Sequence, residues 1–163
     1  MVHGCLYSKN TTACVNIADY IHDLLEQLKK SFDYEDRPIK IEMKADDVLL
    51  DGDTATHFGV LFNEVVTNTF KHAFHDNPSP FLGISIQKQP RDTLHLVIKD
   101  NGCGLKEDID PKHPQSFGMQ VIQLMVEDQL DGSFQFSNKG GTHFSATLKY
   151  TYHENFDSGR YCH

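Results

Sequence analysis

The sequence lacks any segment that would place it in a membrane. Among its 163 residues, no apolar run approaches the roughly 18 residues needed to span a bilayer. Residues 1–15 lack the basic start and the apolar stretch of a signal peptide. We therefore expect a cytoplasmic chain without membrane contact. One domain is expected, because a chain of this length buries roughly 70% of its unfolded surface.

Metal and disulfide patterns are missing as well. The ten histidines are scattered without an HExxH motif, and the cysteines lie at irregular spacing without a CxxC pair. These spacings argue against a zinc site or a disulfide scaffold, so we expect reduced thiols. The four cysteines are Cys5, Cys14, Cys103 and Cys162.

Positive charge is scarce. Fifteen basic residues stand against 23 acidic ones, which gives a formal net charge of -8. No basic stripe is available to neutralise a nucleic acid or an anionic membrane, so neither is expected as a partner. Any bound phosphate must be held by local groups, and the sequence has no Walker A lysine motif for that task.

Apolar periodicity and turn signals predict the order helix, strand, helix, two strands, helix, two strands. Asn16 can cap the first helix and Ser116 the third. The predicted helices cover 16–32, 54–74 and 116–130, and the predicted strands cover 39–44, 82–87, 94–99, 133–137 and 142–152. This order suits the α/β class, as an α+β two-layer sandwich with three helices on one face of a mixed sheet.

The predicted helix at 54–74 carries a polar stripe within its segment NEVVTNTFKHAF. At α-helical spacing, a carboxylate, an amide, an amine and an imidazole share an arc of roughly 100°. The helix can thus bury its apolar face and present these groups to a cavity, although a solvated helix face would give the same pattern. The four residues are Glu64, Asn68, Lys71 and His72.

The segment IKDNGCGL, at 98–105, places Asp100 at the end of a predicted strand. Asn-Gly after a strand is typical of a hairpin turn, but the following residues carry charge and prolines rather than a returning strand. A flat ligand could approach the backbone closely at Gly102 and Gly104. Asp100 could then accept a hydrogen bond from an exocyclic amine.

Two further segments are weak signals when taken alone. SFGMQVI, at 116–122, begins a predicted helix, whose free amide groups and dipole attract phosphate. NKGGTHFSATL, at 138–148, contains two glycines between predicted strands, which is most simply a hairpin turn.

In this order and spacing, the four segments resemble the GHKL ATPases, the superfamily of gyrase, heat-shock chaperone, histidine kinase and mismatch-repair ATPases. Residues 63–74 look like the N box, and DNGCGL looks like the first glycine box. SFGMQVI followed by Gly141-Thr142 is similar to the second glycine box and its closing strand. The resemblance spans about 53–150 and implies a Bergerat-type fold that binds ATP and Mg²⁺.

The resemblance also implies roles for single residues. Asp100 would bind the adenine amine, with Thr142 near the same edge, and Asn68 would be the magnesium ligand. Glu64 matches the acid that polarises an attacking water or the accepting side chain. The implied catalytic residues are Glu64, Lys71 and His72, the last two facing the phosphates. The implied nucleotide-binding residues are Asn68, Asp100, Gly102, Gly104, Ser116, Phe117, Gly118 and Thr142.

Within the superfamily, the Lys-His-Ala-Phe ending of the N box is most similar to sensor histidine kinases. HGCLYS, at 3–8, resembles the junction after the dimerisation helices of such kinases. We therefore expect a linker at 1–15, the catalytic domain at 16–152 and a polar tail at 153–163. The implied partners are an upstream domain that carries the acceptor histidine and a response regulator receiver domain.

The sequence departs from the superfamily pattern at two places. The segment 105–115 is short for an ATP lid, and Ser116 stands where many relatives have glycine. Two other functions fit the same fold: a serine protein kinase of the anti-sigma-factor type, and a regulatory domain that binds nucleotide without catalysis.

Overall fold

The computed structural model describes residues 14–34, 37–104 and 117–150. The front segment at 3–8, the short loop at 105–115, Ser116 and the polar tail lie outside these residues. Within the described part of the chain, no helix is long and apolar enough to cross a bilayer.

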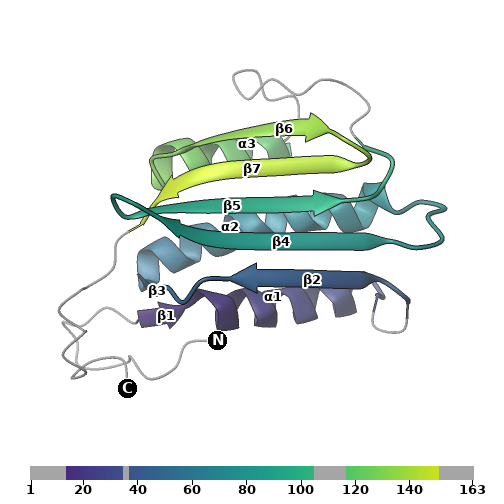
Figure 1. Cartoon of the computed structure of the whole chain (residues 1–163), viewed down its shortest axis with the longest axis horizontal. Helices are drawn as coiled ribbons and strands as arrows, with labels where there is room; N and C mark the ends of the chain where they lie inside the picture. The colour runs from purple at the N-terminus through teal and green to yellow at the C-terminus, as the bar shows by residue number, and fades with distance from the viewer. Residues whose placement is uncertain (1–13, 35–36, 105–116, 151–163) are drawn as a thin grey trace.

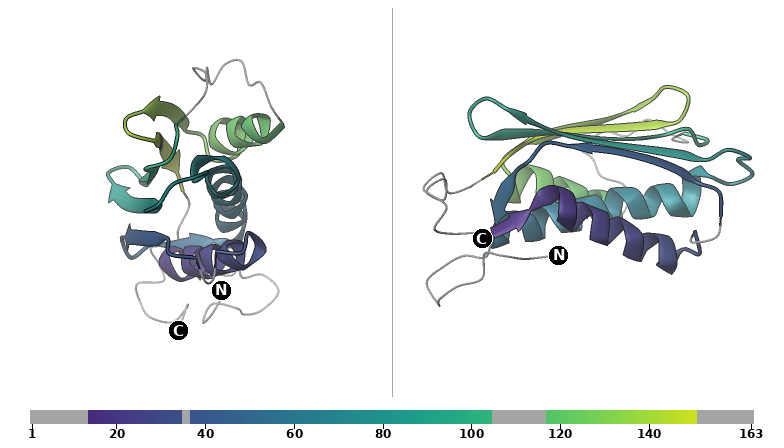
Figure 2. Two further views of the ribbon diagram at one scale, coloured as in Figure 1. Left: turned by 90° about the vertical axis from the view of Figure 1, so that its right-hand side faces the viewer. Right: turned by 60° about the horizontal axis from the view of Figure 1, so that its bottom comes forward.

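A five-stranded mixed sheet forms one layer of the molecule, and three helices cover one of its faces (Figures 1 and 2). The strand order is β2-β4-β5-β7-β6, with β2 and β4 parallel and every other pair antiparallel. The strands are β2 (Lys40–Ala45), β4 (Phe81–Gln89), β5 (Thr93–Asp100), β6 (Ser133–Asn138) and β7 (Thr142–Lys149). The α-helices are α1 (Ile17–Ser31), α2 (Gly52–Asn68) and α3 (Phe117–Gln123). The predicted two-layer sandwich is confirmed.

The core lies between these two layers. Alternate residues of β5 point inward, so that Leu94, Leu96 and Ile98 are buried while their neighbours are more exposed. Phe58 and Phe62 of α2 lie one turn apart and are fully buried opposite the sheet. Removal of this apolar surface from water is the main force that holds the helices on the sheet.

A small two-stranded sheet was not predicted. β1 (Cys14–Asn16) pairs antiparallel with β3 (Leu49–Asp51), and each strand has only three residues, too few for a periodic pattern. The two strands end in the N-cap residues of α1 and α2. The Asn16 side chain accepts from the Asp19 amide, as predicted, and the Asp51 side chain accepts from the Thr54 amide. Helices α1 and α2 therefore both begin at the ends of this two-stranded β1–β3 ladder.

The cysteines differ from the expectation. Cys14 is disulfide-bonded, so the prediction of reduced thiols is wrong for this residue, whereas Cys103 is free and exposed. Irregular spacing in the sequence does not reveal which cysteines meet in space, because pairing depends on the folded distance between them.

Two predicted helices change their winding before they end. α2 continues as the π-helix η1 (Thr69–Ala73), and α3 continues as the π-helix η2 (Leu124–Gln129). A π-helix has hydrogen bonds from i to i+5 and is often found at functional sites. The last predicted strand is also shorter, because β7 ends at Lys149.

The cap of α2 gives a first prediction, because this helix carries two of the four residues of the predicted polar stripe, Glu64 and Asn68. Asp51→Ala removes the acceptor that lies 2.7 Å from the Thr54 amide. We expect the free energy of unfolding to fall by about 1 kcal/mol, measured by urea denaturation. Asp51→Asn keeps an acceptor oxygen and is the control, with a loss less than half as large. Equal losses in the two variants would contradict a capping role.

Candidate functional site

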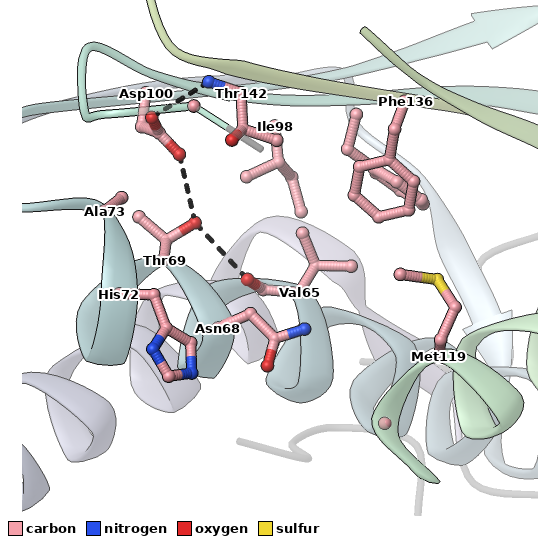
Figure 3. A pocket seen from close by; sticks show the side chains of 13 residues that line it. Val65, Asn68, Thr69, His72, Ala73, Ile98, Asp100, Met119, Phe136 and Thr142 are labelled. Atoms are coloured by element: carbon pink, nitrogen blue, oxygen red, sulfur yellow. Dashed lines mark hydrogen bonds between the residues drawn. The ribbon is translucent and has the colours of Figure 1, made fainter. Parts of the chain in front are cut away.

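A cavity of about 350 Å³ lies between the helical layer and the sheet. Its wall is partly apolar, from side chains of α2, α3 and the strands, and Figure 3 shows these residues around the open space. The apolar residues include Val65, Ile98, Met119, Phe136 and Phe144. The polar residues are Asn68, Thr69, His72, Asp100 and Thr142. Such a cleft, mostly apolar with a few polar groups, is typical of a small-molecule site.

Asp100 lies at the sheet side of the cavity and is only 8% exposed. Its Oδ1 accepts hydrogen bonds from the backbone amides of Gly102, at 2.8 Å, and Thr142, at 3.1 Å. A buried carboxylate needs such partners, because burying an unpaired charge is strongly unfavourable. The two amides therefore fix the direction of the side chain and leave Oδ2 toward the cavity (Figure 3).

Oδ2 of Asp100 has one partner among the described residues, the hydroxyl of Thr69 at 3.3 Å. Thr69 is the first residue of η1 and is 6% exposed. The sequence interpretation did not include it. A threonine in a helix commonly donates to the backbone carbonyl four residues earlier, which is that of Val65 here. The sequence alone therefore did not indicate that Thr69 belongs to the site.

Gly141 brings β7 close enough for the Thr142 amide to reach Asp100. Its φ is +135°, and a Cβ placed there would lie 2.0 Å from the backbone oxygen of Asp100. Only glycine fits both this conformation and this contact. Gly104 also has a positive φ, +81°, and lines the cavity, as predicted for the first glycine box.

Gly102 has a different role from the predicted one. It is not among the cavity-lining residues, and a Cβ placed there would lie 2.3 Å from the backbone oxygen of Ala73. The next amide, that of Cys103, donates to the same oxygen at 3.0 Å. Gly102 thus allows the loop after β5 to pack on the end of η1, rather than bringing a flat ligand to the backbone.

Asn101 holds the same loop from its other side. Its Oδ1 accepts from the Phe81 amide at 2.8 Å, and its Nδ2 donates to the Ser79 carbonyl at 2.8 Å. The Asn77 side chain donates to both the side-chain and the backbone oxygen of Asn101. The Asn-Gly pair is therefore not a hairpin turn between paired strands but part of a loop tied to the start of β4.

The predicted polar stripe, which runs from α2 into η1, lines the cavity only in part. Asn68 and His72 line it, whereas Lys71 is exposed and is not among the lining residues. The prediction assumed α-helical spacing to residue 74, but the π-helical turn from Thr69 onward changes the direction of each later side chain.

The start of α3 brings the stripe together with the second predicted glycine box. Gly118 lines the cavity, and a Cβ placed there would lie 3.5 Å from Oε2 of Glu64 and 4.0 Å from Nδ2 of Asn68. Glu64 itself is half-buried. Phe117 is 76% exposed and is not among the lining residues, so the structure does not bring this predicted residue to the site.

The cavity thus has two chemically different ends. Asp100 and Thr142 form an end that can accept a hydrogen bond beside apolar walls, which suits a flat base carrying an amine. Asn68 and Gly118 form the other end, at the start of α3. Glu64 is not among the lining residues, but its carboxylate lies next to Gly118. Among the described residues there is no group of three His, Cys, Asp or Glu side chains that could hold a metal.

This fold and cavity define a nucleotide-binding domain with helices on one face of a mixed sheet. Residues 53–152 match the family model described as histidine kinase-, DNA gyrase B- and HSP90-like ATPase. The chain belongs to this ATPase family. The resemblance found in the sequence is thereby confirmed.

Curated relatives place the chain near the sensor kinases of that family. It is 31% identical to the sensor histidine kinase PdtaS of Mycobacterium tuberculosis over 135 residues, which cover 82% of this chain and 26% of PdtaS. It is 30% identical over 89 residues to blue-light-activated histidine kinase 2 of Erythrobacter litoralis, covering 55% of this chain and 26% of that protein. The chain spans about a quarter of the length of these relatives.

Solved structures have the same fold. The histidine kinase domain of the EL346 blue-light activated histidine kinase from Erythrobacter litoralis superposes with a TM-score of 0.76 at 22% identity, over 90% of this chain and 71% of that one. The catalytic domain of histidine kinase ThkA superposes with a TM-score of 0.68 at 14% identity, over 86% of this chain and 96% of that one.

The close packing at Gly102 gives a second prediction. Gly102→Ala forces the loop away from the Ala73 carbonyl, because a Cβ has no room there. We expect the free energy of unfolding to fall by about 1 to 3 kcal/mol in denaturant melts. Gly118→Ala is the control, since its Cβ would make ordinary contacts at 3.5 Å and beyond. A Gly102→Ala protein as stable as this control would contradict the packing role.

Proposed function

We propose that this chain binds Mg·ATP in the cavity and supplies the γ-phosphoryl group that phosphorylates a histidine in a two-component sensor kinase. The observation that carries the proposal is that Asp100, from the sheet, and Asn68, from the helical layer, line one and the same cavity. A nucleotide could then contact Asp100 with its base and Asn68 with its phosphates.

In this proposal the adenine amine donates to Oδ2 of Asp100, and Thr142 lies at the same edge of the base. Oδ1 is already occupied by two amides, so Oδ2 is the oxygen left for the ligand. Gly104 borders the base without a side chain. The apolar wall formed by Ile98 and Phe144 excludes water from its faces.

At the other end, Asn68 is the proposed Mg²⁺ ligand. An amide oxygen fits this cation, which prefers oxygen ligands and commonly takes the rest from waters and substrate phosphates. When bound, Mg²⁺ would neutralise charge on the phosphates. The backbone at Gly118 is proposed to border the triphosphate, and Lys71 and His72 are proposed to contact it.

In the transfer, the chain itself would position the nucleotide and polarise the accepting side chain. The bond from the γ-phosphorus to its bridging oxygen breaks, a bond to the acceptor imidazole nitrogen forms, and ADP remains. Glu64 is the residue proposed to polarise the accepting side chain, because it is half-buried beside Gly118 and Asn68. Phosphoryl transfer needs little more from a protein than alignment and electrostatic stabilisation.

The acceptor histidine is proposed to lie on an upstream dimerisation domain of the same polypeptide, and a response regulator receiver domain would take the phosphoryl group from it. We propose a cytoplasmic location for this domain. The two curated relatives named above are sensor histidine kinases, which favours this function over a serine kinase of the anti-sigma-factor type and over a regulatory domain without catalysis.

Nucleotide binding should stabilise the fold. Mg·ADP at about 100 times its dissociation constant should raise the free energy of unfolding by about 2.7 kcal/mol, because it binds only the folded state. A thermal melt of the chain with Mg·ADP, compared with Mg²⁺ alone, measures the effect. An unchanged melting temperature at millimolar Mg·ADP would overturn the proposal.

Asp100 should govern the affinity for the base. Asp100→Asn replaces the accepting Oδ2 by a group that cannot accept from an amine, and we expect a loss of about 1.5 to 3 kcal/mol in binding. This corresponds to about tenfold or more in the dissociation constant for Mg·ADP, measured by calorimetry. Asp131→Asn, in the turn between η2 and β6, removes a carboxylate outside the cavity and is the control. Equal affinities in the two variants would reject the assignment of Asp100 to adenine.

A further inference from the structure

The hydroxyl of Thr69 is a buried polar group that the proposed function does not yet use. It has one proton and two acceptors at the same distance, the Val65 carbonyl and Oδ2 of Asp100, each at 3.3 Å (Figure 3). It can donate to only one of them at a time. The choice decides whether Oδ2 of Asp100 receives a hydrogen bond from the helical layer.

The Val65 carbonyl already has a donor, since the backbone amide of Thr69 donates to it within the helix. Oδ2 of Asp100 has no donor other than Thr69 among the described residues. A hydroxyl turned toward Val65 would also point its lone pairs at a carboxylate oxygen, which is repulsive. The proton therefore belongs on the Asp100 side, where the bond to a charged acceptor is the stronger of the two.

This contact also fixes the carboxylate. The two amides hold Oδ1 and set the direction of the carboxylate, and the Thr69 hydroxyl adds the one contact that Oδ2 receives from the described residues. Thr69 is β-branched and lies in a helical segment, so its own side chain has few rotamers and its hydroxyl stays in place. Oδ2 is thereby held at one point on the cavity wall, with acceptor capacity left for a ligand.

We propose that Thr69 is a positioning residue that sets the base preference of the site. By holding the accepting Oδ2 of Asp100 at one point of the cavity wall, it favours a purine with an amine at position six over one with a carbonyl there. The inference rests on the proposed binding of ATP and names the residue that makes the site selective for adenine. Thr69 itself acts through Asp100.

In the Asp100→Asn variant, the Thr69 hydroxyl would allow residue 100 to present a hydrogen-bond donor to the cavity instead of an acceptor. With asparagine at position 100, the amide nitrogen would replace Oδ2, and Thr69 could then donate to Val65 and accept from this nitrogen. The cavity would present a donor in place of an acceptor. We therefore expect Asp100→Asn to bind the purine with the carbonyl better than the purine with the amine, and this reversal to depend on Thr69.

The test compares Mg·ADP with Mg·IDP, whose base carries a carbonyl at position six, by calorimetry on the whole chain. Thr69→Val keeps the shape of the side chain and removes the hydroxyl, and Thr69→Ser keeps the hydroxyl. We expect Thr69→Val to lose about five- to tenfold in ADP affinity, the size of one lost hydrogen bond, and less than twofold for IDP. Thr69→Ser should stay within about threefold of the wild type for both nucleotides. Melting curves without nucleotide show that each variant is folded.

Two results would overturn the inference: a Thr69→Val protein with the wild-type ratio of ADP to IDP affinity, or one that loses both nucleotides equally, as a packing defect would cause. Should Thr69→Val not fold, Thr69→Ala is measured in the same way, with the same expected fall in the ratio. Comparison of Asp100→Asn with the double variant Asp100→Asn/Thr69→Val adds a second readout. The preference of Asp100→Asn for IDP over ADP should be weaker in the double variant.

If the wild-type chain binds neither nucleotide, the proposed function itself fails. If it binds ADP and the ratio does not respond to Thr69, only this inference fails.

Discussion

A carboxylate held almost out of water is the constraint on which the site depends. Asp100 can be buried because one amide from a loop, one amide from a strand and a hydroxyl from a helix point at it. These donors come from the loop after β5, from the start of β7 and from η1. Satisfying one side chain therefore fixes the relative positions of three segments that are far apart in the sequence, and the cavity is the space left between them.

The glycines serve this constraint mainly through packing between backbones. Gly141 lets β7 touch the backbone of Asp100, and Gly102 lets the next loop touch the end of η1 at Ala73. Neither residue needs to touch a ligand for its replacement to damage the site. The Asp100 end of the cavity is thus held in place by the protein itself, which would reduce the ordering cost of binding a ligand there.

The sequence predicted the parts of this structure that have a long periodic pattern or a strong turn signal. The three helices and the five strands of the main sheet follow from such patterns. The expectation that Asn68 and Asp100 share one cavity came instead from the resemblance to the GHKL ATPases. The β1–β3 ladder was missed because three residues carry no periodicity. The direction of the Lys71 side chain could not be predicted, because a change from α- to π-helical winding has no residue signature. Thr69 was missed because a threonine in a helix bonds to its own backbone as readily as to a site.

The ladder between β1 and β3 has a mechanical consequence. It ties residues 14–16 by backbone hydrogen bonds to the strand from which α2 begins, and the last residue of that helix is Asn68. A helix of 17 residues is a stiff rod roughly 25 Å long. A displacement of β1 would therefore act on the start of this rod, whose other end places Asn68 at the cavity.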